Sequence, residues 1–228
     1  MSEKATELRV RCEPNGTAGK VEVVFALLRK TKLIEPGAAE EAARRIRDGL
    51  VPILKERPGF RLHIGFVSEA CETVGLTLYD DRDPALDAYK RVRGWVTENM
   101  RDLTPDEPEV RLGAVLLERG KVRPVSGGEA ALFVTIRQYV SLWAAEEAIP
   151  LLTERILPPV ERQSGFRGFW AFRDEHDPAH LISVSVWSGR GPAFAAHERV
   201  LEITEPRCSM FSTSPKVTAG AARLLVAE

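Results

Sequence analysis

The chain has 228 residues, 44% of them apolar, which is enough for one large domain or two of ordinary size. Its 32 basic and 33 acidic side chains nearly balance, so composition favours neither nucleic acid nor an anionic membrane as a partner. The N-terminus shows no apolar targeting segment and no apolar run is long enough to span a bilayer, so we expect a cytoplasmic protein.

The first predicted elements are two strands and a helix. Residues 8–12 indicate an extra strand, and residues 21–28 form a β-rich run. From residue 38, apolar side chains advance by three or four positions, as on one face of a helix, at Ala39, Ala42, Ile46, Leu50 and Leu54. Pro52 predicts a kink or short break before the last turn, and Gly59 predicts the left-handed residue that ends a helix.

A hairpin, a second helix and a further strand are predicted next. Alternation predicts two strands whose helix-facing side chains are Phe60, Leu62, Ile64 and Phe66, then Val74, Leu76 and Leu78. Pro84, with Asp83 before it, marks the start of the second helix. The inward face of that helix is Ala85, Ala88, Tyr89, Val92 and Trp95. Residues 111–118 supply the further strand.

The second half of the chain repeats this order. The letters AAEEA of residues 38–42 return at residues 144–148, and 9 of 24 positions match between residues 38–61 and 144–167. Average composition predicts about one or two matches. The repeated elements are a strand at 132–140, a helix from 144 with Pro158 and Gly165, strands at 166–172 and 182–186, a helix from Pro192, and a strand at 208–213.

Each copy therefore has the order β-α-β-β-α-β, which is the ferredoxin-like unit with both helices on one face of a four-stranded sheet. The predicted class is α+β, with two tandem units at residues 1–125 and 126–228 and an extra strand at 223–226. The uncovered faces of the two sheets are predicted to meet as a barrel. Its predicted lining is polar and aromatic, made of Arg61, His63, Thr77, Tyr79, Thr135, Arg137, Tyr139, Arg167, Phe169, Ser185 and Trp187.

Short motifs in both copies resemble a known group. They are Pro-Gly-Phe at residues 58–60, Ser-Gly-Phe at 164–166, Val-Trp-Ser at 186–188 and Ala-His at 196–197. In this pattern the chain resembles the dimeric α+β barrel superfamily, and within it the antibiotic biosynthesis monooxygenase-like domains. Those domains pair two chains, so the resemblance implies a barrel built within one chain here, as a monomer with a pseudo-dimeric barrel or as a homodimer.

The resemblance also implies a class of reaction. The family includes oxygenases that act without a cofactor on small aromatic or quinol substrates, so no cofactor and no metal are expected. Haem-degrading members do not fit, because Arg207 stands where their ligand histidine would fall. The alternative from a different class is a non-catalytic domain that binds a small ligand or a partner protein.

Two histidines are the candidate catalytic bases, His197 on the inward face of a helix and His63 on a strand. The candidate substrate-binding residues are Arg61, Tyr79, Arg137, Tyr139, Phe169 and Trp187. The structural interpretation of His197 is a core histidine satisfied by its neighbours, and that of Arg61 and Arg167 is a set of buried ion pairs that fix how the sheets meet. His176 and His180 fall in a predicted solvated turn.

Overall fold

The computed structural model describes residues 23–123, 132–140, 149–204 and 215–228. Its strands are β1 (Phe25–Lys32), β2 (Phe60–Val67), β3 (Glu72–Tyr79), β4 (Glu109–Gly120), β5 (Phe133–Val140), β6 (Phe166–Arg173), β7 (His180–Trp187) and β8 (Lys216–Ala227). Its helices are α1 (Ala39–Arg45), α2 (Val51–Lys55), α3 (Arg82–Asn99), α5 (Leu157–Glu161) and α6 (Arg190–Thr204). A 3-10 turn (Pro36–Ala38) precedes α1, and π-helical turns (Ile46–Leu50 and Leu152–Ile156) precede α2 and α5.

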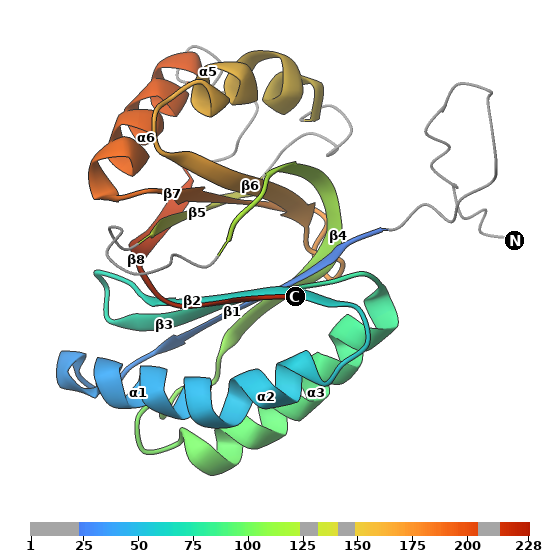
Figure 1. Cartoon of the computed structure of the whole chain (residues 1–228), viewed down its shortest axis with the longest axis vertical. Helices are drawn as coiled ribbons and strands as arrows, with labels where there is room; N and C mark the ends of the chain where they lie inside the picture. Colours follow the sequence, from blue (N-terminus) through green and yellow to red (C-terminus); the bar gives the residue numbers. More distant parts are fainter. Residues whose placement is uncertain (1–22, 124–131, 141–148, 205–214) are drawn as a thin grey trace, which may run out of the picture.

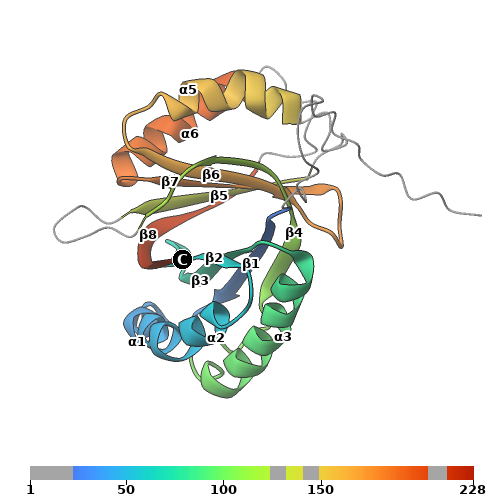
Figure 2. The same cartoon turned by 45° about the vertical axis from the view of Figure 1, so that its right-hand side comes forward.

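The strands form a closed antiparallel barrel in the order β1-β3-β2-β8-β5-β7-β6-β4. Within it, β4-β1-β3-β2 and β8-β5-β7-β6 have the same internal order, so each half of the chain contributes one sheet. The barrel closes where β2 pairs with β8 and where β4 pairs with β6. Helices α1, α2 and α3 cover one side, and α5 and α6 cover the other (Figures 1 and 2). The predicted intrachain α+β barrel is confirmed.

The interior of the barrel is aliphatic and aromatic, which corrects the predicted polar lining. One cluster of buried side chains joins the two sheets without any helix residue, and it includes Leu62, Ile64, Leu76, Val134, Phe172 and Ile182. The polar and aromatic set that includes His63, Tyr79, Tyr139, Phe169 and Trp187 lies on the opposite faces, beneath the helices. The side chains predicted to face the helices therefore fill the barrel instead.

A β-bulge explains how Phe60 departs from the simple alternation. The register of β2 against β3 shifts between Phe60 and Leu62, and that of β6 against β7 shifts between Phe166 and Gly168. A bulge places one extra residue in a strand, so the alternation of side chains between the two faces is shifted by one residue at that point. Phe60 thus packs beneath the helices with Tyr79, while Leu62 points into the barrel.

The first helix of each half is continuous through its proline. A π-helical turn lies directly before α2 and another before α5, and the backbone around Leu50 and Ile156 stays in the right-handed helical region. Proline lacks an N–H and clashes with the carbonyl four residues earlier, which the wider turn accommodates. The predicted irregularity at Pro52 and Pro158 is a widened turn, and Gly59 and Gly165 have the expected positive φ of 71° and 90°.

Two helix and strand assignments change. The α3 helix begins at Arg82, two residues before Pro84, and the Asp81 side chain accepts a hydrogen bond from the Arg82 N–H. The strand predicted as an extra element at 223–226 is part of β8, which pairs with both β2 and β5 and completes the second sheet. Among the described residues, none of the helices has the length and apolar character needed to cross a bilayer.

Several predictions fall on residues outside the described ranges. They are the strand at 8–12, the start of the repeated helix at 144–148, the strand at 208–213, Arg207, and the boundary between residues 125 and 126.

Candidate functional site

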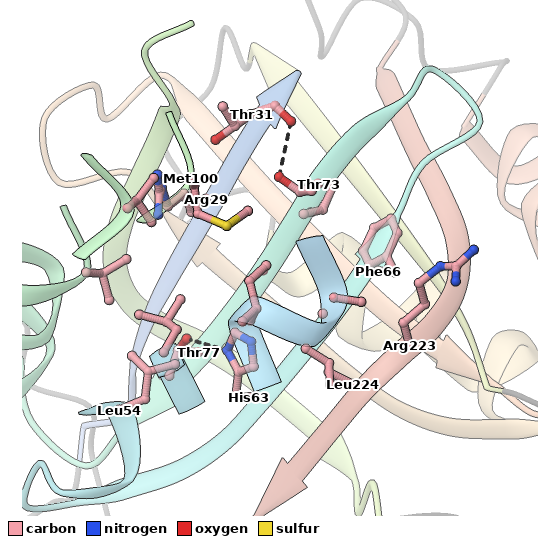
Figure 3. A pocket seen from close by; sticks show the side chains of 18 of the residues that line it. Arg29, Thr31, Leu54, His63, Phe66, Thr73, Thr77, Met100, Arg223 and Leu224 are labelled. Carbon is pink, nitrogen blue, oxygen red and sulfur yellow. Dashed lines mark hydrogen bonds between the residues drawn. The ribbon is translucent and has the colours of Figure 1, made fainter. Parts of the chain in front are cut away.

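A cavity with a volume of about 70 Å³ lies between the first sheet and helices α1, α2 and α3. A cavity needs about 10–15 Å³ by this measure to hold one water, so there is room for roughly five waters or a small ring. Its helix side is apolar, formed by Ile46, Leu50, Leu54, Val92, Val96 and Met100. Figure 3 shows the polar side chains that reach it from the sheet.

The floor of this cavity is set by the strand register. Arg29, Gly75 and Gly65 lie in one row across β1, β3 and β2, because Arg29 pairs with Gly75 and Gly75 pairs with Gly65. In the adjacent row on the same face, Thr77 lies beside His63. The two neighbouring glycines leave a flat strip of backbone between these polar side chains.

His63 is the buried polar group at the centre of the cavity wall, with 4% of its surface exposed. Its Nδ1 lies 2.9 Å from the Thr77 hydroxyl, and its Nε2 has no hydrogen-bond partner among the described residues (Figure 3). Burial lowers the pKa of His63 to about 4, so the imidazole is neutral at pH 7. Because the Thr77 hydroxyl can donate or accept, Nε2 is available to accept from a ligand or donate to it.

Arg29 brings a positive charge to the same cavity. It is half-buried, and no acidic side chain among the described residues forms a salt bridge with it. Burial lowers the pKa of Arg29 to about 10, an effect that nearby Tyr89 partly offsets, so the guanidinium stays charged at pH 7. Desolvating a charge without a partner is costly, and an anionic ligand would supply the missing partner.

Three further polar side chains of the cavity have partners within the protein. The Thr73 hydroxyl donates to the Thr31 carbonyl at 3.2 Å, and the Thr104 hydroxyl donates to the Met100 carbonyl at 3.0 Å. Arg223, which also lines the cavity, is paired with Glu40 of α1. His63 Nε2 and the Arg29 guanidinium are therefore the nitrogen groups of the cavity that are available to a ligand.

The second cavity occupies the equivalent place beneath α5 and α6 and is smaller, about 20 Å³. Four of the predicted site residues line it, namely Arg137, Tyr139, Phe169 and Trp187. Arg137 donates to His197 Nδ1 at 3.2–3.3 Å, so the cation and the histidine satisfy each other. Burial and the neighbouring Arg137 charge lower the pKa of His197.

The other predicted residues lie apart from both cavities or serve the core. Arg61 pairs with Asp80 and lies 3.7 Å from Glu118, in a partly exposed position at the start of β2. The Tyr79 hydroxyl donates to the Leu54 carbonyl at 3.3 Å, and burial raises the pKa of Tyr79 well above its usual value. Arg167 is exposed, which removes it from the predicted barrel lining. His180 Nδ1 lies 2.8 Å from the Asp177 carboxylate in its turn.

Sequence analysis missed Arg29, Gly65 and Gly75, although a signal for them was present. Phe25 and Arg29 of β1 align with Phe133 and Arg137 of β5 at a constant offset, because each phenylalanine begins its strand and each arginine follows four residues later. Extending the sequence repeat into the first strand would have identified Arg29 as the residue equivalent to Arg137. The glycines carry no side-chain chemistry and are visible only through the strand register.

Solved structures with the same fold have little sequence identity to the chain. A protein from Fusobacterium nucleatum, provisionally named a monooxygenase, has TM-score 0.72 and 8% identity over 92% of this chain and 96% of that one. Another, from Lactobacillus acidophilus and named in the same way, has TM-score 0.68 and 9% identity over 90% and 97%. An anthrone oxidase-like protein has TM-score 0.61 and 12% identity over 90% and 93%.

No protein-family model and no curated protein matches the sequence. The structural likenesses and the closed eight-stranded antiparallel barrel show that the chain has the dimeric α+β barrel fold, with both sheets supplied by one chain. At these identities the likenesses establish the fold and leave the activity to the chain's own residues.

Proposed function

We propose that the chain is a cofactor-independent monooxygenase that acts on a small aromatic or quinol substrate in the cavity beneath α1, α2 and α3. The observation that carries the proposal is the buried, neutral His63, whose Nε2 has no partner among the described residues and faces a cavity that also holds the Arg29 cation. The monooxygenase names of two structural neighbours support this class of reaction by analogy.

In the proposed reaction, a substrate hydroxyl or acidic C–H gives its proton to His63 Nε2. The resulting anion is electron-rich and lies near the positive charge of Arg29, which stabilises it. Molecular oxygen accepts electrons from the anion and forms a C–O bond, and the hydroperoxide takes up the proton. Its O–O bond then breaks, so that one oxygen atom stays on the substrate as a carbonyl and the other leaves as water.

The low pKa of His63 both helps and limits this step. The imidazole is fully unprotonated at pH 7, so no enzyme molecules are lost to the charged form. A base with so low a pKa is intrinsically weak, and the proton transfer depends on attraction between the new imidazolium and the substrate anion in a dry cavity. If that attraction is insufficient, the same cavity serves the alternative function of binding a ligand without chemistry.

Oxygen uptake with a panel of hydroquinones and anthrones tests the proposal. We expect the wild-type protein to consume oxygen with at least one of them, and His63→Ala to reduce the rate by about 10²–10⁴-fold. His197→Ala is the matched control, because His197 is held by Arg137 away from the larger cavity, and its rate should stay at the wild-type value. Uptake unaffected by His63→Ala would remove the assigned base, and binding without uptake would favour the non-catalytic alternative.

A further inference from the structure

Among the described residues, Arg29 differs from Lys30 and Arg111, two other partly or fully buried cations, in having no acidic partner. Lys30 Nζ lies 2.9 Å from Glu109, and Arg111 Nη1 lies 2.7 Å from Asp174. For Arg29 no such contact exists among the described residues, although much of the side chain is removed from water. A neutral substrate would leave this charge unpaired in the occupied cavity, whereas an anionic group would satisfy it with charge-assisted hydrogen bonds.

The floor beside Arg29 is shaped for a flat group. Gly75 and Gly65 are direct cross-strand neighbours, and Leu224 lies next to Gly65 in the same row. A Cβ on Gly75 would come within 3.3 Å of the His63 ring, and one on Gly65 within 3.4 Å of Leu224. The missing side chains therefore keep open a planar strip beside Arg29 and His63, and apolar helix residues line the opposite side of the cavity.

In the second half of the chain, larger side chains occupy the space equivalent to this cavity. The strand registers place Ser183 and Ala171 at the positions of Gly75 and Gly65, and Phe169 at the position of His63. Tyr139 and Leu181 stand where Thr31 and Thr73 stand in the first half. Larger side chains thus fill the equivalent cavity, and the arginine there uses His197 as its partner.

We propose that the chain binds one planar aromatic carboxylate, in the first-half cavity only, with its carboxylate on Arg29 and its ring on the Gly65–Gly75 strip. A ring hydroxyl of this ligand faces His63 Nε2. The inference rests on the proposed function in taking this cavity as the substrate site, and it names the substrate class. The binding itself requires no chemistry and can be measured separately.

Calorimetric titration with 4-hydroxybenzoate and with its neutral twin 4-hydroxybenzamide tests the charge requirement. The acid should bind with a stoichiometry of one per chain and about tenfold or more tighter than the amide, as expected for an ionic hydrogen-bonded pair. Arg29→Met should abolish this preference and leave the affinity for the amide nearly unchanged. Arg137→Met is the matched control, and it should retain the preference because Arg137 lies at the filled position.

Gly75→Ser tests the floor by introducing the residue that the second half carries. We expect it to weaken binding of both ring compounds, with the melting temperature measured in the same samples to show that the protein remains folded.

Equal affinity for acid and amide, a preference that survives Arg29→Met, two sites per chain, or no binding of either compound would overturn the proposal. If the carboxylate proposal fails but the protein consumes oxygen with neutral hydroquinones, the proposed monooxygenase function is still supported. If the acid binds but no oxygen is consumed, the carboxylate site is supported and the monooxygenase function is not.

Discussion

Burial determines the charge state of His63. The ring is surrounded by protein, and the Thr77 hydroxyl satisfies one nitrogen while the other faces the cavity. The second half places Phe169 at the same point of the sheet, where it contributes to an apolar core. A buried histidine in place of a phenylalanine costs stability whenever the ring must carry a proton, which makes the penalty measurable.

The pH dependence of stability should report this penalty. The folded-state pKa of His63 is about 4, below the ordinary value of 6.5, so between these values the unfolded chain binds a proton that the folded chain does not. The free energy of unfolding should therefore fall as the pH drops from 6.5 to 4, by up to about 3 kcal/mol from this residue.

The control is His63→Phe, which introduces the residue of the second half. His197 and the carboxylates titrate in both proteins, so the difference between the two denaturation curves isolates His63. We expect a constant difference above pH 7 and a relative loss for the wild type below pH 6.5. Parallel curves from pH 7.5 to pH 4 would show that His63 is protonated as easily in the folded chain as in the unfolded one.

Sequence analysis found His63 and Arg137 because their residue types are chemically distinctive. It assigned them to the barrel interior, whereas they lie on the faces covered by the helices. Each strand is buried on both faces, and alternation identifies two sets of side chains without saying which set contacts the helices. Arg61 and Arg167 were included for the same reason, although the structure places them in exposed or partly exposed positions at the starts of β2 and β6. The kind of functional group was predictable at these positions, and the face of the sheet on which it lies was not.

At the scale of elements, the first helix of each half forms the roof of its cavity through a π-helical turn. That turn lies between α1 and α2 in the first half and brings Leu50 and Leu54 over the cavity. Spacing predicted the helix and its proline irregularity, because an amphipathic face and a missing N–H are both local properties. The wider turn itself depends on how the helix packs, so the sequence did not specify it.

Two helical glycines should respond oppositely to alanine. Gly94 in α3 has open space around an added Cβ, so Gly94→Ala should raise the free energy of unfolding by about 0.5–1 kcal/mol through helix propensity. At Gly49, in the π-helical turn, an added Cβ would lie 2.6 Å from Cζ2 of the Trp95 indole. Gly49→Ala should lower the free energy of unfolding by about 1–3 kcal/mol through overpacking.

Urea denaturation of both variants beside the wild type provides the measurement. The same substitution in two helices controls for the general effect of alanine on helix stability. Stabilisation by Gly49→Ala as large as that by Gly94→Ala would show that the contact between the first helix and α3 is looser than the structure describes.

At the scale of the whole molecule, the two halves are joined by strand pairing along two seams and differ in the side chains that lie beneath their helices. Strand β8 pairs with β2 of the first sheet, and β4 pairs with β6 of the second, so the two sheets are hydrogen-bonded to each other along both seams of the barrel. The α+β class and the barrel were predictable because the apolar register recurs along the chain. The single enlarged cavity was not, since it depends on two glycines becoming neighbours across β2 and β3.

The central claim is that the ligand site lies beneath α1, α2 and α3, in the first half alone. The most direct test follows backbone amide chemical shifts of the full chain during titration with 4-hydroxybenzoate. The account predicts that Gly65 and Gly75 shift with a common dissociation constant, while their counterparts Ala171 and Ser183 do not move. Shifts at Ala171 and Ser183, or at the barrel-lining Ile182 without change at the glycines, would contradict it.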